Sequence, residues 1–368
     1  MSNAHFQANS QSSRTKILFV GLGAIGQRHL RNLHALLGDR AEFLAWRSLK
    51  TPTPTLAPDM SVRDDVSLEI EYSMRTFADL DEALSRAPQI AVIANPTSLH
   101  IETALRCARA GCHLFIEKPL SHSLQNLDEL AQIVAQKKLT AFVAYPLRFH
   151  PACQLVKKLL DENAIGTLLT ARLAFGESLP GWHPYEDYRQ SYAARRDLGG
   201  GVVLTQIHDL DLALWLFGTP QRVFALGGTW SELETDVEDC VSALWEFQLQ
   251  NGRSFPVHIQ QDYLQKPPQR LWEITGSRAK IVLDLAKSRV EIVDFLDGES
   301  TIHDFGNFER NQMFLDEMRH FLDCVASKTA PLVTLEEGAQ SLQLALASLC
   351  SMESGEVVEL DRIAKMLR

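Results

Sequence analysis

The chain has 368 residues, of which 45% are hydrophobic and 22% charged, a composition typical of a soluble globular protein with room for two domains. Its formal net charge of −10 argues against nucleic-acid binding, because neutralising phosphates requires clustered Lys and Arg. No apolar run is long enough to span a membrane, and the polar residues 1–14 are predicted to form a disordered arm without a secretory signal. The six cysteines form no CxxC pair; we predict that Cys107 and Cys112 are buried thiols rather than a bridge or ligands, and that the protein is cytoplasmic.

The first element is an apolar strand at 17–20, followed by a glycine-rich turn and a helical pattern that stops at Gly38. The turn consists of Gly21, Leu22, Gly23, Ala24, Ile25 and Gly26. Gly21 permits the tight bend, Gly23 lets the backbone approach a pyrophosphate, and Gly26 lets the helix pack against the strand. The free N–H groups at the helix start then face the phosphates. We therefore predict that residues 21 and 23–26 bind a dinucleotide; the alternative is a glycine-rich turn without a ligand.

The second strand, at 41–46, ends in Arg47 and Ser48. A preference for NAD would place Asp or Glu here to bind the ribose 2′-hydroxyl, and neither is present. Arg47 and Ser48 suit a 2′-phosphate instead, which favours NADP over NAD, although an exposed Arg at a strand end is also common. The prolines between 52 and 58 predict that the usual crossover helix is shortened or replaced by a loop.

Two further strands, at 89–94 and 113–116, end in groups of polar residues. The first group comprises Asn95, Pro96, Thr97 and His100, the last within a helix that runs to 110. Because ligands bind at the carboxyl ends of the strands in such a sheet, we predict that this group lies beside the cofactor. The second group is Glu117-Lys118-Pro119, followed by a helix at about 123–137 and a strand at 140–144. This alternation predicts a doubly wound parallel sheet of the Rossmann type over residues 15–145.

Residues 146–368 follow a different pattern. The predicted elements are a helix at about 151–163, a strand at 168–175, a loop at 177–198, a helix at 202–217, period-two strands at 221–229, 237–250, 253–263, 269–275, 279–284 and 288–295, and helices at about 310–327 and 335–351. Asn251-Gly252 is a strong hairpin signal. Strands without intervening helices predict an α+β domain with an open, mostly antiparallel sheet.

With these motifs, nearly the whole chain resembles the glucose–fructose oxidoreductase/inositol dehydrogenase (Gfo/Idh/MocA) family. The resemblance rests on the turn at 21–26, Asn95-Pro96-Thr97 with His100, Glu117-Lys118-Pro119, and the helix that carries His208 and Asp211. It implies an N-terminal nicotinamide domain and a C-terminal domain with an open, mostly antiparallel sheet. It also implies a substrate among sugars, sugar derivatives, nucleotide sugars and polyols.

The resemblance assigns Lys118 to the substrate and the cofactor ribose, and it implies that Pro119 often follows a cis bond. A lysine aimed into the cleft and partly buried has a lowered pKa, which suits proton exchange with an alcohol. Glu117 pairs with this lysine or holds the nicotinamide ribose. The alternative for Glu117 and Lys118 is a surface ion pair.

The resemblance makes His208 an acid/base near the substrate carbon, with substrate binding or a structural role in the helix as alternatives. Relatives usually carry an aspartate about one turn before this histidine, whereas Thr205 or Leu204 stands there in this chain. The departure removes a partner that would raise the pKa of His208, unless Asp209 or Asp211 substitutes.

The substrate site is predicted to draw on the second domain and on the link to it. Its candidate residues are Arg148, Trp182, Tyr192, Arg195, Thr205, His208 and Asp211. Aromatic rings of the 182–196 loop can stack on sugar faces, and its arginines can bind a carboxylate or a phosphate. A structural or subunit-contacting arm is the alternative for this loop. No set of residues has the spacing of a metal site.

The sequence therefore predicts an NAD(P)-dependent oxidoreductase that moves a hydride between nicotinamide and a carbon of a sugar, nucleotide sugar or polyol, with Lys118 and His208 moving the proton. Two rivals are a redox-cycling NAD-dependent glycosidase of the same superfamily and a non-catalytic dinucleotide-binding regulator. Apolar residues on both faces of the strand at 241–247 predict a homo-oligomer, a dimer or tetramer, formed through the C-terminal sheet.

Overall fold

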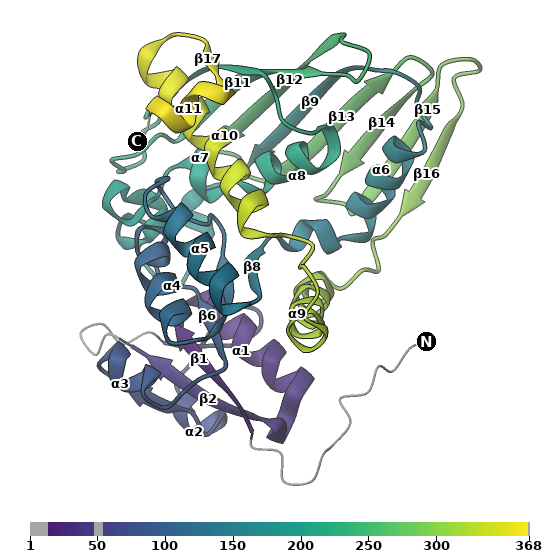
Figure 1. Ribbon diagram of the computed structural model, residues 1–368. Helices are drawn as coiled ribbons and strands as arrows, with labels where there is room; N and C mark the ends of the chain where they lie inside the picture. The colour runs from purple at the N-terminus through teal and green to yellow at the C-terminus, as the bar shows by residue number, and fades with distance from the viewer. Residues whose placement is uncertain (1–13, 48–53, 367–368) are drawn as a thin grey trace.

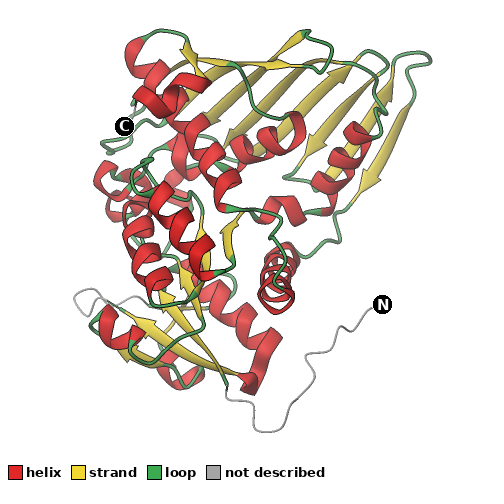
Figure 2. Cartoon of the chain, in the orientation of Figure 1, coloured by secondary structure: helices red, strands yellow, loops and turns green. Residues whose placement is uncertain are grey.

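The computed structural model describes residues 14–47 and 54–366, with side chains up to Ile363. The predicted arm, except for residue 14, and Ser48 lie outside the described residues. The chain forms two large sheets, one in each half of the sequence, with helices packed around both (Figures 1 and 2).

The first sheet has six parallel strands in the spatial order β5-β2-β1-β6-β7-β8. Its strands are β1 (Thr15–Val20), β2 (Ala41–Trp46), β5 (Arg75–Phe77), β6 (Ile90–Ile93), β7 (His113–Glu117) and β8 (Ala141–Ala144). The strand order reverses between β1 and β6, and nucleotides bind at the crevice that such a reversal creates. The predicted doubly wound Rossmann sheet is confirmed, with β5 as an additional strand.

The helices of this half are mostly those that the sequence predicts. They are α1 (Ala24–Leu37), α2 (Leu68–Glu71), α3 (Leu80–Leu84), α4 (His100–Arg109) and α5 (Leu127–Lys137), with the 3₁₀ helices η1 (Gly38–Arg40) and η2 (Thr97–Leu99). Between β2 and β5, the described residues hold the small strands β3 (Thr55–Leu56) and β4 (Val62–Arg63) and only the four-residue helix α2. The predicted shortening of this crossover is therefore confirmed.

The second sheet has nine strands in the order β16-β15-β14-β13-β9-β12-β11-β10-β17. Its strands are β9 (Leu168–Gly176), β10 (Arg222–Gly228), β11 (Cys240–Gln248), β12 (Ser254–Asp262), β13 (Gln269–Gly276), β14 (Ala279–Asp284), β15 (Arg289–Asp294), β16 (Ser300–Asp304) and β17 (Val358–Glu359). Neighbours pair antiparallel except β9 and β12, which are parallel. The predicted hairpin is confirmed: β11 and β12 are joined through Gly252, whose φ is +82°. The strands β16 and β17 lie outside the predicted set.

Helices cover one face of the second sheet (Figure 2). They are α6 (Pro151–Asp161), α7 (Val202–Thr205), α8 (His208–Phe217), α10 (Leu335–Ser354) and α11 (Leu360–Met366). The 3₁₀ helices of this half are η3 (Pro146–Phe149), η4 (Leu179–Gly181), η5 (Tyr188–Gln190), η6 (Tyr192–Ala194) and η7 (Arg196–Leu198). Trp245 and Trp272 are buried on the covered face. On the opposite face, Leu226 is 55% and Leu244 50% exposed.

The helix α9 (Arg310–Ser327) belongs to the second half of the sequence but packs against the first domain (Figure 1). The Phe321 ring lies 5.4 Å from the ring of Phe115 on β7. Near the start of α9, the Asn311 amide donates a hydrogen bond of 2.8 Å to Asn32 on α1. The helix therefore ties the end of the chain to the Rossmann sheet.

The helix that the sequence predicts at 202–217 is broken, and this prediction is wrong. It divides into α7 and α8 around Gln206 and Ile207. The break exposes two carbonyl groups to partners from elsewhere: Thr205 C=O accepts from Lys118 Nζ at 2.8 Å, and Gln206 C=O accepts from Gln261 Nε2 at 2.9 Å. These tertiary bonds replace intrahelical ones, which the local pattern cannot reveal.

The link between the two halves carries a buried ion pair. Arg148 on η3 is 2% exposed, and its Nε and Nη2 donate to the two carboxylate oxygens of Asp211 at 2.9 and 2.7 Å. Its Nη1 donates to Glu337 at 2.7 Å. The contact fixes η3 against α8 and α10.

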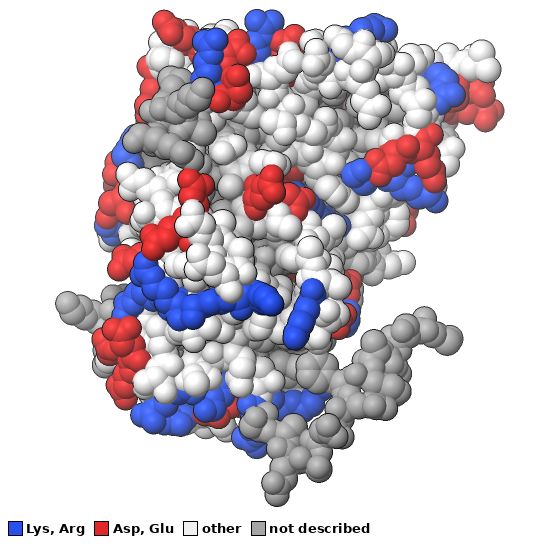
Figure 3. All heavy atoms as spheres, viewed as in Figure 1, with Lys and Arg blue, Asp and Glu red and all other residues white. Residues whose placement is uncertain are grey.

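The structure also shows the hydropathy of the helices and the distribution of charge on the surface. No helix among the described residues is long and apolar enough to cross a membrane. Basic and acidic side chains are interspersed over the face seen in Figure 3.

We predict that Arg148→Ala lowers the free energy of unfolding by roughly 3–5 kcal/mol, because it leaves the buried Asp211 carboxylate without its partner. Urea unfolding followed by circular dichroism measures the change. The control is Arg319→Ala, which removes a half-exposed pair with Asp316 and is expected to cost less than about 1 kcal/mol. Equal losses in the two variants would contradict a structural role for the Arg148 pair.

Candidate active site

The turn after β1 has the backbone geometry that a pyrophosphate needs. Gly21 has a φ of +93°, and a Cβ there would lie 2.5 Å from the backbone of Ala94. A Cβ on Gly26 would lie 2.3 Å from the Gly21 carbonyl oxygen, so both positions require glycine. A Cβ on Gly23 would meet no atom within 4 Å, which leaves open space in front of the turn.

The N-terminus of α1 has no side-chain cap and no acidic residue in its first turn. Its N–H groups and positive dipole end therefore suit an anion. The Tyr185 hydroxyl lies close enough to the backbone of Ala24 at this point to affect the pKa of Tyr185, which burial raises to about 12 and the Ala24 backbone lowers. Tyr185 comes from the loop after β9, so this loop reaches across to the turn, a contact that the sequence does not reveal. The residues fit a dinucleotide: 21–26 for its phosphates, with Tyr185 at their edge.

The end of β2 carries an ion pair. Arg47 Nη1 lies 2.7 Å from Glu69 Oε1, and Thr76 donates to the same oxygen at 3.3 Å. The sequence reasoning missed Glu69, because it lies 22 residues beyond Arg47, on α2. A 2′-phosphate would meet this carboxylate as well as the guanidinium.

The loop after β6 is held by His100. This side chain is buried, and its ring nitrogens lie 2.9 Å from the Pro119 carbonyl oxygen and 2.8 Å from that of Asn95. Burial lowers the pKa of His100. The ring thus joins the loops that follow β6 and β7, a positioning role. Asn95 donates to Thr103 at 3.1 Å, while its buried side-chain oxygen has no partner among the described residues. Pro96 and Thr97 complete this loop beside the glycine turn.

Glu117 ends β7 and is buried beside His29 of α1, with 2.6 Å between His29 Nε2 and the carboxylate. The other carboxylate oxygen accepts from the Lys118 N–H at 3.1 Å. Although burial opposes ionisation, the hydrogen bond from His29 and nearby positive charges hold the pKa of Glu117 below its usual range. His29 was missed at the sequence level; its signal is its place three residues after Gly26, on the helix face that packs on the sheet.

Lys118 projects from the end of β7 to the second domain, where its Nζ donates to the Thr205 carbonyl oxygen at 2.8 Å. The Lys118-Pro119 peptide bond is cis. Burial lowers the pKa of Lys118 to about 8; Glu117 opposes this and Arg270 adds to it. A lysine with this pKa exchanges a proton near neutral pH.

His208 begins α8, close to Lys118, and is partly buried with an edge-on contact of 5.9 Å to the Tyr145 ring. Its pKa is well below the usual value because of burial and of the charges of Lys118, Arg270 and Arg310. A neutral imidazole is therefore its stable form.

The two aspartates of α8 have other partners than His208. Asp209 accepts from Arg270 at 2.8 Å and from Trp272 Nε1 at 2.9 Å. Asp211 is the ion-pair partner of Arg148. These two residues, each predicted from the sequence to bind the substrate, are therefore hydrogen-bonded to each other. Neither carboxylate therefore takes the place of the missing aspartate as a partner of His208.

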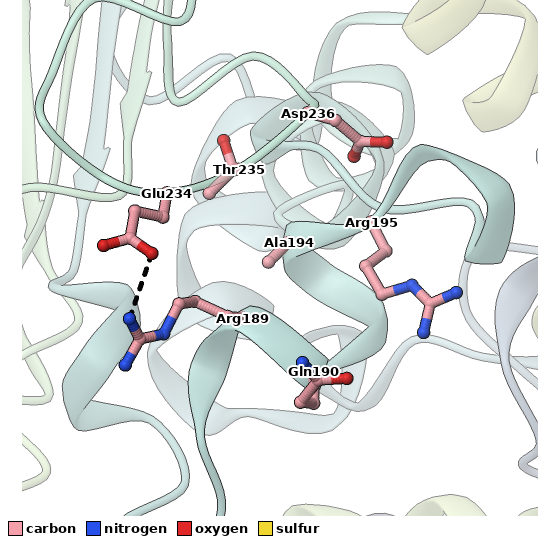
Figure 4. A pocket seen from close by; sticks show the side chains of 7 residues that line it. All are labelled: Arg189, Gln190, Ala194, Arg195, Glu234, Thr235 and Asp236. Atoms are coloured by element: carbon pink, nitrogen blue, oxygen red, sulfur yellow. Dashed lines mark hydrogen bonds and ion pairs between the residues drawn. The ribbon is translucent and has the colours of Figure 1, made fainter.

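The other candidate substrate residues lie on the loop at 177–198 and on α7. The Thr205 hydroxyl, buried, lies 2.5 Å from the Tyr263 hydroxyl, and Trp182 stands edge-on to the Tyr263 ring at 5.3 Å. Tyr192, on η6, is partly buried. Arg195 pairs with Asp197 at 2.6 Å and, with Arg189 and Glu234, lines a surface hollow of about 510 Å³ (Figure 4). Neither Lys118 nor His208 lines that hollow.

Metal chemistry has no visible site: among the side chains that the structure describes, no group of three or more His, Cys, Asp or Glu residues is placed to hold a metal ion.

Comparison with known proteins agrees with this geometry. A family model described as an oxidoreductase family with an NAD-binding Rossmann fold matches residues 15–145, and a model of the GFO/IDH/MocA C-terminal domain matches residues 153–282. Myo-inositol 2-dehydrogenase of Thermotoga maritima is 26% identical over 360 residues, which cover 95% of this chain and 99% of that protein. Levoglucosan dehydrogenase of Pseudarthrobacter phenanthrenivorans is 34% identical over 215 residues, 57% of this chain and 54% of that protein.

The solved structure of a levoglucosan dehydrogenase in complex with NADH and levoglucosan has the same fold, with a TM-score of 0.78 and 19% identity over 95% of this chain and all of that one (100%). Both halves of the sequence are thus matched. The chain belongs to the Gfo/Idh/MocA family of oxidoreductases.

Proposed function

We propose that this protein is an NAD(P)-dependent oxidoreductase that moves a hydride between nicotinamide and a hydroxyl-bearing carbon of a sugar, nucleotide sugar or polyol. The observation that carries the proposal is Lys118: an amine with a pKa of about 8, fixed at the carboxyl end of β7 where the domains meet. The inositol and levoglucosan dehydrogenases among its relatives support this class of substrate.

The cofactor would be held by the residues at the carboxyl ends of β1, β6 and β7. We assign Gly21, Gly23, Ala24, Ile25 and Gly26 to the pyrophosphate, and Asn95, Pro96, Thr97 and Glu117 to the nicotinamide half. When bound, the nicotinamide ring supplies the hydride acceptor or donor. The protein orients the partners and moves the proton.

In the oxidative direction, the neutral Lys118 amine accepts the proton of the substrate hydroxyl as the carbon–hydrogen bond breaks. In the reductive direction, the ammonium form returns it. The neutral His208 imidazole accepts or donates a hydrogen bond to the same hydroxyl and thereby orients it. Trp182, Tyr192 and Thr205 are proposed to border the sugar.

We also propose a homo-oligomer formed through the uncovered face of the second sheet. Leu226 and Leu244 lie exposed on neighbouring strands of that face, and Phe224 stands opposite Leu244 in the strand register. Apolar side chains gathered on one sheet face favour burial against another subunit.

The first prediction tests the function. Lys118→Ala is expected to lower turnover roughly a hundred- to ten-thousand-fold while cofactor affinity is retained, and Lys118→Arg to do little better, because guanidinium keeps its proton. In the wild type, the rate of alcohol oxidation is expected to rise as pH increases through about 8, since only the deprotonated amine accepts a proton. The rate of the reverse reduction is expected to fall over the same pH range, since only the ammonium form donates one. The rising limb is absent in Lys118→Ala.

The measurement is nicotinamide absorbance with cofactor-loaded protein and a panel of inositols, free sugars and nucleotide sugars. The matched control is Lys287→Ala, because Lys287 is an exposed lysine in the turn between β14 and β15, paired with Asp284. Near-normal turnover in Lys118→Ala would refute the mechanism. Cofactor binding without turnover of any panel member would favour a regulator, and product formation without net absorbance change would favour a redox-cycling glycosidase.

The second prediction concerns the cofactor. We expect NADP(H) to bind more tightly than NAD(H), and Arg47→Ala to weaken NADP binding by roughly 1.5–3 kcal/mol through loss of a charge-assisted contact, with little effect on NAD. Glu69→Gln removes the carboxylate that competes for Arg47, so it is expected to increase the preference for NADP. Calorimetric titration of both cofactors measures these affinities. An NADP affinity that Arg47→Ala leaves unchanged contradicts the proposed phosphate contact.

The third prediction concerns assembly. Light scattering is expected to give a dimer or tetramer at micromolar concentration, and Leu244→Arg to reduce the mass by placing a charge on the apolar face. Leu296→Arg is the control, because Leu296 is 96% exposed in the turn after β15 and off the sheet face. A monomeric wild type would rule out the proposed assembly.

A further inference from the structure

Positive charges gather around His208. Three cationic side chains come from three separate elements: Lys118 after β7, Arg270 on β13 and Arg310 at the start of α9. All three are near enough to His208 for their charges to lower its pKa. Only tertiary structure brings them together, since they are far apart in the sequence.

Arg310 has no fixed partner. Its guanidinium makes no hydrogen bond and no ion pair with any residue in the described part of the chain, and the residue is exposed to solvent. It is the first residue of α9, whose N-terminus has no side-chain cap and no acidic residue in its first turn. A cation at this end of a helix opposes the helix dipole. Burial and the charge of Arg270 lower the pKa of Arg310, and the charge of Glu177 opposes this without an ion pair.

Arg28 adds a fourth cation on the adjacent surface of α1. Its guanidinium lies over the Phe314 ring of α9, 4.6 Å from the centroid. Burial and the charges of Arg310 and Arg31 lower its pKa to about 10. The positive charges of Arg28 on α1 and Arg310 on α9 thus repel each other.

Arg270 is held rigidly and keeps one donor unused. Its Nη2 donates to Asp209 at 2.8 Å, and its guanidinium lies on the Phe175 ring, 3.7 Å from the centroid. The side chain is 15% exposed. Its Nε is buried without a partner among the described residues, although a buried N–H normally donates a hydrogen bond.

The nearby carboxylates do not balance the positive charges of Lys118, Arg270 and Arg310. Glu117 is held by His29, and Asp209 by Arg270 and Trp272. Among the described residues, no carboxylate lies within ion-pair distance of Lys118 or Arg310. Arg270 has Asp209 as its partner, but Lys118 and Arg310 add positive charge beside it, and like charges held close together are costly unless a ligand of opposite charge joins them.

We propose that the substrate carries an anionic group, a carboxylate or a phosphate, that binds Arg310 and Arg270 while its reacting hydroxyl faces Lys118. The proposal rests on the proposed function and narrows its substrate class to sugar acids or phosphorylated sugars. The planar forks of Arg310 and Arg270 suit the paired oxygens of either group. The cofactor pyrophosphate has its own site at the N-terminus of α1, so the two anions have separate positions.

The test measures anion binding to the NAD-loaded protein by calorimetry, with malonate and inorganic phosphate as probes at constant ionic strength. Wild-type protein is expected to bind at least one probe, and Arg310→Gln to weaken that binding roughly ten- to hundred-fold through loss of a charge-assisted contact. Arg270→Lys, which keeps the charge near Asp209 but loses the planar fork, is expected to weaken it as well. The matched control is Arg319→Gln, on the same helix but paired with Asp316, and it should bind like the wild type.

Binding of malonate alone assigns the group as a carboxylate, and binding of phosphate alone as a phosphate. Three results would overturn the proposal: no binding of either probe, binding unchanged in Arg310→Gln, or an equal loss of NAD affinity in Arg310→Gln, which would assign these cations to the cofactor. None of these measurements depends on turnover. If the proposed oxidoreductase activity is wrong, the nicotinamide absorbance assay with the sugar panel shows this independently of anion binding.

Discussion

The hydrogen bond between Lys118 and the Thr205 carbonyl oxygen is the contact on which the proposed site depends. It joins the carboxyl end of a Rossmann strand to the end of α7, so the amine is fixed where the two domains meet. The charge of Glu117 stabilises the proton on this amine, whereas burial and the charge of Arg270 lower its pKa to about 8. The balance leaves a group that can both take and give a proton near neutral pH.

Other residues make this contact possible by holding the loops around it. His29 fixes Glu117, and His100 links the Pro119 and Asn95 carbonyl oxygens, so the segment before and after Lys118 is held from two sides. Gly199, with a φ of +79°, brings the second domain so near that a Cβ would lie 2.9 Å from the Thr97 Cβ. Close domain approach and a rigid lysine are therefore parts of one arrangement.

Much of the fold could be predicted from the sequence because its signals are local. The glycine turn, the alternation of strands and helices, and the Asn251-Gly252 hairpin each depend on neighbouring residues. The break at Gln206 could not be predicted, since it reflects hydrogen bonds with Lys118 and Gln261, which are distant in the chain. The packing of α9 on the first domain has the same origin.

In the candidate site, too, the residues with a local motif could be predicted, whereas those brought in by tertiary structure could not. The motifs that contain Gly21 and Lys118 lie together at one edge of the sheet, as parallel strands require. Sequence reasoning chose Arg148 and Arg195 for their residue type, but these side chains already pair with carboxylates. Arg270 and Arg310 carry no local motif, and only the folded chain brings them to His208.

The acceptor for Lys118 is a main-chain carbonyl, and every residue type supplies one. Substitutions at position 205, here a threonine that contacts Tyr263, can therefore alter the surroundings of the proposed substrate without removing the acceptor of the lysine. Evolution is thus free to vary the shape of the proposed substrate site and the proton-transfer group independently. This separation offers a physical route by which one scaffold can change its substrate while it retains its chemistry.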